Sequence, residues 1–195
     1  NGVRQRYYED VDASAISNIE RVEVLKGPSS VLFGQSAVGG IVSIVTKRPQ
    51  REFGGSVSGV VGSFDQKAVS FDVTGPLAKD AGLYFRATGE VERSGTYVDY
   101  QDIDRENAAL SLTWEASDNI TAYFVSEWQE RRTQRNPGLP IVGTVVSNGV
   151  REIPAETFLG DPGRSDLEAF SPLLQAWVDI KLNDTWTLTP RLSYS

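Results

Sequence analysis

Apolar and polar residues alternate along most of the chain after Pro49. Phe85 and Val91 belong to one face of an extended segment, and Arg86 and Glu90 belong to the other. Successive side chains of a β-strand point to opposite sides, so a period of two indicates strands with one apolar face. The pattern predicts about seven strands and no helix after this point, over residues 56–62, 69–74, 83–92, 107–114, 120–125, 176–182 and 186–194.

The segment before Pro49 has a different pattern. Apolar runs at 19–25 and 41–45 predict two strands, and an apolar stretch at 15–19 predicts one helical turn before the first. Pro28 suits the first turn of a helix and Gly34 suits its end, so a short helix is expected between them. The first part of the chain therefore resembles a small mixed α/β unit.

Alternating strands fit two architectures, a soluble β-sandwich and a transmembrane β-barrel. Strands of about ten residues match the length that crosses a bilayer at a tilt. The predicted connections are short at 77–82, 115–119 and 183–185 and long at 94–104 and 130–170. Short turns on one side and long loops on the other are typical of outer-membrane barrels, so the barrel is favoured over the sandwich.

Tryptophan positions agree with a barrel. Trp114 and Trp186 are adjacent to predicted short turns, whereas Trp128 is adjacent to a long loop, which predicts aromatic residues at both membrane rims. Two features fit less well. Pro190 falls inside a predicted strand, where it cannot donate a ladder hydrogen bond, and the connection 62–67 is short although it is expected on the long-loop side.

Composition excludes several kinds of chemistry. The 195 residues include no Cys and no His, which removes disulfides, thiolate and imidazole metal sites, and His-dependent catalytic triads. The net charge of -7 argues against nucleic-acid binding, which needs a basic surface. No apolar run is long enough for a transmembrane helix. The absence of Met and an alternating run that reaches Ser195 predict that the chain is a piece of a longer protein.

Residues 19–49, IERVEVLKGPSSVLFGQSAVGGIVSIVTKRP, closely resemble the end of the plug domain of TonB-dependent outer-membrane receptors, particularly those for ferric siderophores. Shorter segments resemble successive pieces of the barrel of these receptors. They are Gly62-Ser63, DVTGPL at 72–77, Leu112-Thr113-Trp114, Gly138-Leu139-Pro140 and FLGDP at 158–162.

This resemblance implies a mostly β structure, in which residues 1–48 are the last part of the plug and residues 49–195 are the first strands of a barrel of about 22 strands. It implies a non-enzymatic receptor of the bacterial outer membrane that imports a ferric siderophore with TonB-coupled energy. Iron would be held by the siderophore, so no cofactor or protein metal site is expected. The implied partners are the TonB protein, the siderophore, and outer-membrane lipid and lipopolysaccharide, with a monomeric state for the complete receptor and no role for nucleic acid.

Two groups of residues are candidates for contacts in such a receptor. Charged residues of the plug are expected to form ion pairs with the barrel wall: Glu20, Arg21, Lys47 and Arg48. Cationic, phenolic and amide side chains suit a large, oxygen-rich, anionic chelate. By position, the ligand candidates are Arg6, Tyr7 and Tyr8 in the plug and Arg131, Arg132, Arg135 and Asn136 at the start of the longest loop. Packing between plug strands, lipopolysaccharide contact and a solvated loop are alternatives for these residues.

Three other functions remain to be compared with siderophore import. The same receptor type could carry another large ligand, such as a glycan, a cobalamin or a different metal chelate. A passive porin disagrees with the plug-like segment that precedes the strands. A β-rich glycosidase that uses paired carboxylates is compatible with the composition, but no residue pattern favours it.

Overall fold

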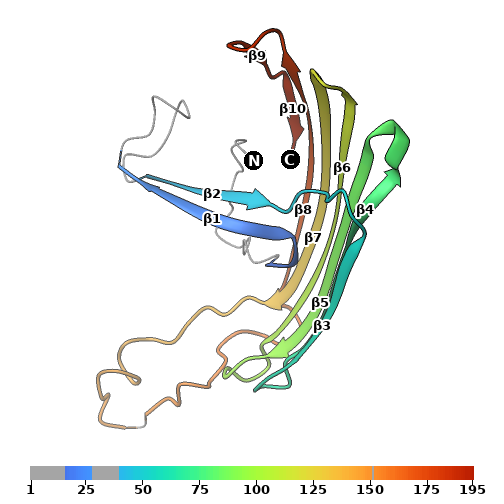
Figure 1. Cartoon of the computed structure of the whole chain (residues 1–195). Coiled ribbons are helices and arrows are strands. Elements are labelled where there is room, and N and C mark those ends of the chain that lie inside the picture. Colours follow the sequence, from blue (N-terminus) through green and yellow to red (C-terminus); the bar gives the residue numbers. More distant parts are fainter. Residues whose placement is uncertain (1–15, 28–39, 151) are drawn as a thin grey trace.

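A computed structural model describes residues 16–27, 40–150 and 152–195 of the chain. The described residues form a β-hairpin and a large curved sheet, and the hairpin lies on the concave side of the sheet (Figure 1). The short helix expected between Pro28 and Gly34 lies outside the described residues.

The hairpin contains β1 (Ile19–Lys26) and β2 (Gly40–Thr46), which pair in antiparallel register. A single turn of 3-10 helix, η1 (Ile16–Asn18), leads into β1 and confirms the helical turn that was expected there. Both strands lie where the apolar runs predicted them. In the described part of the chain, no helix is long and apolar enough to cross a membrane.

The large sheet is antiparallel, and neighbouring strands in the sheet follow one another in sequence except at one edge. Its order is β10-β8-β7-β6-β5-β4-β3, with β9 paired to β8. The strands are β3 (Gly54–Val61), β4 (Lys67–Ala78), β5 (Leu83–Gly95), β6 (Asp102–Ser117), β7 (Ile120–Gln134), β8 (Asp166–Lys181), β9 (Thr187–Leu188) and β10 (Arg191–Tyr194). A second 3-10 turn, η2 (Lys79–Ala81), joins β4 to β5.

The sheet has one strand more than the seven predicted, because the last predicted strand is divided. Pro190 separates β9 from β10, as expected for a residue that cannot donate to a β-ladder. Its carbonyl still accepts a hydrogen bond of 3.2 Å from the backbone N–H of Val178. The predicted short connection 62–67 is confirmed as a tight turn between β3 and β4.

Strands β6, β7 and β8 are longer than the alternation predicted, and the expected loop boundaries are therefore wrong. The prediction placed residues 130–170 in a long loop, but β7 continues to Gln134 and β8 begins at Asp166. Arg131 pairs with Ala169 and Arg132 with Glu168 in the β7–β8 register. Charged residues occupy both faces at these strand ends, so the backbone remains paired after the apolar alternation has stopped.

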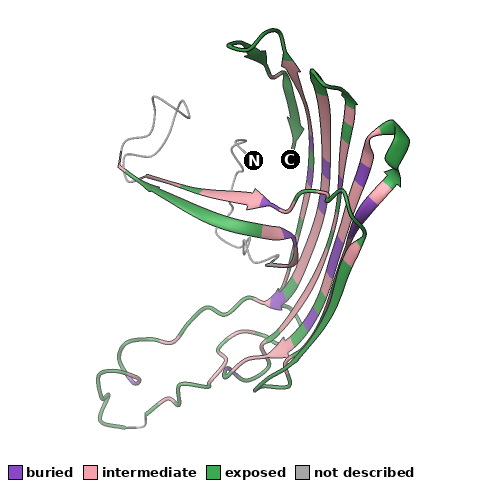
Figure 2. Ribbon diagram, in the orientation of Figure 1, coloured by how far each residue is buried: buried purple, intermediate pink, exposed green. Residues whose placement is uncertain are grey.

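In the sheet, polar side chains are buried and large apolar side chains are exposed, which is the reverse of the pattern in a soluble protein. Glu92 is 9% exposed and its neighbour Val91 is 48% exposed, and Ser111 is 3% exposed beside Leu110 at 40%. Buried and half-buried positions recur along the strands β4–β8 in Figure 2. Buried polar residues on the concave side and exposed apolar residues on the convex side are the arrangement of a membrane-spanning wall with a polar interior. A sandwich would show the reverse.

Replacing Gly82 with alanine is expected to destabilise the folded protein by about 1–2 kcal/mol. Gly82 has a φ of 66° after η2, and a Cβ there would lie 2.6 Å from the carbonyl oxygen of Glu115. Gly59→Ala is the matched control, because the nearest atom to its added Cβ is 4.0 Å away. Urea unfolding in lipid vesicles measures both changes, and equal effects of the two would contradict the assignment of strain to Gly82.

Candidate functional site

The base of the hairpin, residues 18 and 46–51, is where the N-terminal unit meets the sheet (Figure 1). The Asn18 side chain donates a 2.9 Å hydrogen bond to the Glu127 carboxylate of β7, and both residues are buried. The backbone N–H of Lys47 donates to the carbonyl of Asn18 at 2.9 Å. The beginning of β1 and the end of β2 are therefore joined to each other and to the wall at one point.

Asp72 of β4 is the centre of a second attachment. Its Oδ2 accepts a hydrogen bond of 2.8 Å from the Lys47 ammonium and one of 2.7 Å from the Arg86 guanidinium, whose Nε also donates to Oδ1 at 2.8 Å. Arg86 further donates to the carbonyl of Arg48 at 3.0 Å. A bidentate arginine contact is among the stronger charge-assisted interactions in proteins. One carboxylate thus holds a cation of the hairpin base and a cation of the wall together.

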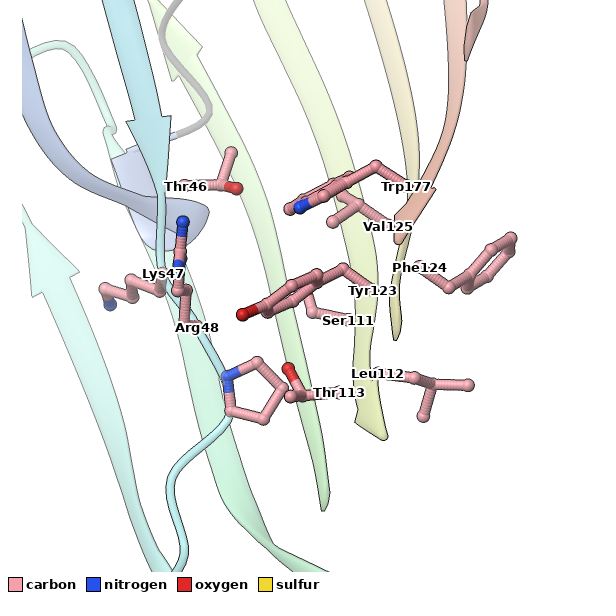
Figure 3. A pocket seen from close by; sticks show the side chains of 11 residues that line it. Thr46, Lys47, Arg48, Ser111, Leu112, Thr113, Tyr123, Phe124, Val125 and Trp177 are labelled. Carbon is pink, nitrogen blue, oxygen red and sulfur yellow. The ribbon is translucent and has the colours of Figure 1, made fainter. Parts of the chain in front are cut away.

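Aromatic residues of the wall form a third attachment, shown in Figure 3. The Arg48 guanidinium lies 5.3 Å from the centre of the Tyr123 ring, within the range of a cation–π interaction. Tyr123 stacks on Trp177 of β8 with ring centres 4.9 Å apart, and Arg191 lies over Trp177 at 5.9 Å. A pocket lies between residues 46–49 and the wall at this point. Leu112 of β6 also borders it, but its side chain points away from the hairpin base. Four side chains therefore form a cation–aromatic ladder along the concave face.

Two further contacts continue along residues 50 and 51. The backbone N–H of Gln50 donates to the Thr74 hydroxyl at 2.8 Å, and Arg51 pairs with Glu115 of β6 at 2.8 Å. The pKa of Arg51 is raised above its ordinary value, mainly by the hydrogen bond to Glu115 and secondly by the negative charge of that carboxylate. Together, these contacts of the hairpin base reach the four neighbouring strands β4, β5, β6 and β7, a width of about 15 Å at the usual strand spacing.

Replacing Tyr123 with leucine is expected to weaken the attachment of residue 48 by about 1 kcal/mol, because the cation–π contact is lost. The amide of Gln50 should then exchange with solvent deuterium about fivefold faster, since its hydrogen bond to Thr74 opens more often. Hydrogen-exchange mass spectrometry of the folded protein measures this. Tyr123→Phe retains the ring and should leave the exchange rate unchanged; a similar increase in both variants would contradict the role of the ring.

The four residues predicted to pair with the wall divide into two pairs. Lys47 and Arg48 contact wall residues, as described above. Arg21 instead forms ion pairs within β1, at 3.6 Å to Glu20 and 2.7 Å to Glu23, and all three side chains are about half exposed. The hydrogen bond and the charge of Glu23 raise the pKa of Arg21. The structure thus places Glu20 and Arg21 together on the hairpin and shows no ion pair between them and the described wall residues.

Of the seven residues predicted to contact the ligand, the structure describes only the four of the sheet and its long loop. Arg6, Tyr7 and Tyr8 lie outside the described residues. Arg131 and Arg132 belong to β7 and do not open the long loop, which starts at Arg135. Arg132 pairs with Glu130 and, at 3.3 Å, with Glu168. By alternation it shares the convex face with the exposed apolar residues and points away from the interior.

Arg135 and Asn136 do lie at the start of the long loop. The backbone N–H of Arg135 donates to the carbonyl of Ser165 at 2.6 Å, which joins the two ends of the loop. The Asn136 side chain accepts a 2.9 Å hydrogen bond from the backbone N–H of Gly138. The structure therefore brings Arg131, Arg132 and Arg135 to the same end of the sheet but places Arg131 and Arg132 on opposite faces of β7.

Several wall residues of the site were not predicted. They are Asp72, Tyr123, Glu127 and Trp177. Each lies on the concave, polar face of its strand, and a place on that face is the sequence signal that could have identified them. Among the described residues, no group of three or more His, Cys, Asp or Glu side chains is arranged to hold a metal ion. The described contacts are ion pairs, hydrogen bonds and ring contacts, and this arrangement can hold one element against another.

Known proteins resemble the chain both in sequence and in fold. The family model of the TonB-dependent Receptor Plug Domain matches residues 1–41. The metal-pseudopaline receptor CntO of Pseudomonas aeruginosa is 34% identical over 91% of this chain and 25% of its own length. The ferrioxamine B receptor of Salmonella typhimurium is 30% identical over 90% of this chain and 25% of its own length.

Solved structures show the same fold. FpvA of P. aeruginosa, bound to a heterologous pyoverdine and iron, superposes with a TM-score of 0.82 at 22% identity over 91% of this chain and 24% of its own. The ferric-catecholate import receptor Fiu of E. coli superposes with a TM-score of 0.80 at 22% identity, over 91% of this chain and 28% of its own. The chain spans about a quarter of the length of the curated relatives it matches.

Proposed function

Because the chain belongs to the TonB-dependent receptors, we propose that the complete protein binds a ferric siderophore outside the cell and imports it across the outer membrane with energy supplied through TonB. The observation that carries this proposal is the hairpin held on the polar, concave face of a sheet whose convex face is apolar and exposed. A plug inside a membrane-spanning wall suits a gated transporter for a large solute. An open porin would leave this interior free.

The division between plug and barrel is proposed to fall after residue 48. The plug family match ends at residue 41, β2 ends at Thr46 and β3 begins at Gly54. The intervening segment carries the contacts to Asp72, Tyr123 and Thr74, so it forms the junction of the two domains. The complete receptor is proposed to be a monomer that contacts TonB from the inner side of the membrane.

Ligand contact is proposed for the plug residues Arg6, Tyr7 and Tyr8 and for the outer-end residues Arg131, Arg135 and Asn136. Cationic and phenolic groups suit an anionic chelate through charge-assisted hydrogen bonds and stacking. Arg132 is proposed to contact lipopolysaccharide instead, because it shares the convex face with Phe170 and Trp128, which make a ring contact with centres 6.3 Å apart.

A second candidate cargo is a metal chelate whose metal is not iron. The relative with 34% identity is named a metal-pseudopaline receptor, whereas the relative with 30% identity is named a ferrioxamine B receptor. Both names describe a receptor for a metal bound by an organic chelator. The relatives therefore support a metal chelate as the ligand more strongly than they support iron as its metal.

The test uses the complete gene in an iron-starved strain that lacks its own siderophore receptors. Radioactive iron is supplied on a panel of hydroxamate, catecholate and carboxylate siderophores, with and without functional TonB. Accumulation of one chelate that disappears without TonB is the expected result. Nickel, zinc and cobalt isotopes supplied with the same chelators distinguish the second candidate.

Other outcomes contradict the proposal in different ways. Accumulation that persists without TonB would indicate a passive pore. A correctly inserted receptor that accumulates no metal chelate, but does accumulate a glycan or a cobalamin, would retain the transport class and replace the ligand.

A further inference from the structure

Asn148 lies in the long loop between β7 and β8, in a turn that its own side chain helps to form. Its Oδ1 accepts a 2.9 Å hydrogen bond from the backbone N–H of Val150, two residues further along the chain. The side-chain carbonyl therefore folds back across the Gly149 peptide. The backbone N–H of Gly149 donates to the Ser147 hydroxyl at 3.2 Å. A backbone nitrogen and a side-chain amide are thus held close to each other.

The turn is open around the nitrogen of Gly149. Asn148 and Gly149 are both exposed, and a Cβ added at Gly149 would have no described atom within 4 Å. Gly149 has a φ of 72°, in the left-handed region that disfavours a side chain. Among the described residues, Asn148 is the only asparagine that precedes a glycine, and the pair Asn1-Gly2 lies outside them.

Two other asparagines form the same kind of turn. The Oδ1 of Asn136 accepts a 2.9 Å hydrogen bond from the backbone N–H of Gly138, and the Oδ1 of Asn183 accepts one of 3.0 Å from Thr185. Both asparagines are exposed, as Asn148 is. The three turns therefore share their side-chain geometry and their access to water.

The residue after each asparagine distinguishes the three turns. Asn136 is followed by Pro137, whose nitrogen has no proton to lose. Asn183 is followed by Asp184, whose negative charge disfavours loss of a proton from its own backbone N–H. Only at Asn148 is the next nitrogen that of an unhindered glycine, among the described residues. These differences decide which of the three amides the backbone can attack.

We propose that Asn148 is a site of spontaneous deamidation in which the backbone of the next residue is the nucleophile. The Gly149 nitrogen attacks Cγ of Asn148 and loses its proton to water by way of the Ser147 hydroxyl, so that a new C–N bond closes a succinimide ring. The Cγ–Nδ2 bond breaks, and the side-chain nitrogen takes up a proton and leaves as ammonia. The Val150 N–H donates to the oxygen on which negative charge develops. Water then opens the ring at either carbonyl and gives aspartate or isoaspartate.

Deamidation changes the loop in charge and in backbone length. Either product has a carboxylate where Asn148 had a neutral amide, and isoaspartate also adds a methylene to the backbone. The turn is enclosed by two hydrogen bonds of 2.7 Å, from the Gly143 N–H to the Val146 carbonyl and from the Ile153 N–H to the Gly143 carbonyl. A longer backbone would strain them. An aged receptor therefore differs from a newly made one in this loop, whatever its cargo is.

The experiment incubates the complete receptor in isolated outer membranes, in mildly alkaline buffer made with water labelled with heavy oxygen. Peptide mapping by mass spectrometry follows Asn148, Asn136 and Asn183 over time, and transfer of a radioactive methyl group by isoaspartyl methyltransferase detects isoaspartate. Asn148 is expected to convert at least about tenfold faster than the other two, which corresponds to a barrier lower by about 1.4 kcal/mol. Its product should carry heavy oxygen from the opening of the ring.

Gly149→Ala is the matched variant, because its added Cβ lies in open space and leaves the loop free to fold. Conversion of Asn148 should slow at least about fivefold, since a side chain crowds the nitrogen and disfavours the left-handed backbone. An unchanged rate in this variant would overturn the proposal, as would conversion of Asn183 at the rate of Asn148. Slower conversion in the receptor than in a synthetic peptide of residues 144–152 would also overturn it, because the fold would then protect the amide.

Discussion

Replacing Asp72 with alanine is expected to lower the free energy of unfolding of the complete protein by about 3–5 kcal/mol, the usual range for removing one partner of a buried ion pair. Asp72 accepts hydrogen bonds from both Lys47 and Arg86 at 2.7–2.8 Å, and its side chain is 12% exposed. Alanine would leave two cations close together on the concave face without a counter-charge. Urea unfolding of the receptor in lipid vesicles measures the change.

The matched control is Arg51→Ala, which removes an ion pair of the same segment in a solvated position. Arg51 lies 2.8 Å from Glu115, but its side chain is 75% exposed. Exposed ion pairs contribute about 0–1 kcal/mol, so this variant should unfold almost like the unmodified protein. Equal losses for the two variants would show that burial does not determine the strength of the attachment at Asp72.

Replacing Leu110 with arginine is expected to destabilise the protein in a bilayer by about 2–4 kcal/mol, because Leu110 lies near the middle of β6 on the convex, apolar face. Its paired neighbours on the same face are Ala87 and Ser126. An arginine there would have to reach the membrane surface or draw water into the hydrocarbon layer. Unfolding in vesicles, together with the yield of protease-resistant receptor in isolated outer membranes, measures the effect.

Asn107→Arg is the control for this substitution on the same strand. Asn107 lies on the concave face, where its register partners are Glu90 and Gln129. A cation at this position would be solvated or paired with a carboxylate, so a change of at most about 1 kcal/mol is expected. If Asn107→Arg were the more damaging of the two, the assignment of the convex face to lipid would be wrong.

Much of the wall could be predicted from the sequence, because the membrane requires one apolar face over the length of each crossing. Phe85 and Val91 identify the outward face of β5 in the alternation, and the burial of Glu92 beside Val91 confirms it. The strand ends could not be predicted in this way. Arg131 and Arg132 continue β7 through backbone pairing with β8, and backbone pairing does not depend on an apolar pattern.

The hairpin base was predicted only in part. Lys47 and Arg48 are adjacent cations at the end of an apolar run, so their role in contacting another element could be inferred from local sequence. Their partners depend on which residues of the wall the hairpin faces. Asp72 is 25 residues from Lys47, and Glu127 is 109 residues from Asn18, so these contacts depend on the register of several strands. The outward position of Arg132 likewise depends on the extension of β7.

The order of strands has a consequence for how the chain folds. From β3 to β8, each strand pairs with the next in sequence, so contacts within the wall have a low contact order and the hairpins can form one after another. The bond between Asn18 and Glu127 closes a loop of 109 residues, which carries a larger entropic cost than a single turn. The nascent wall must reach β7 before Asn18 has its partner. The contacts of Lys47 and Gln50 with β4 can form early, whereas the attachment of Asn18 to β7 is a late step in assembly.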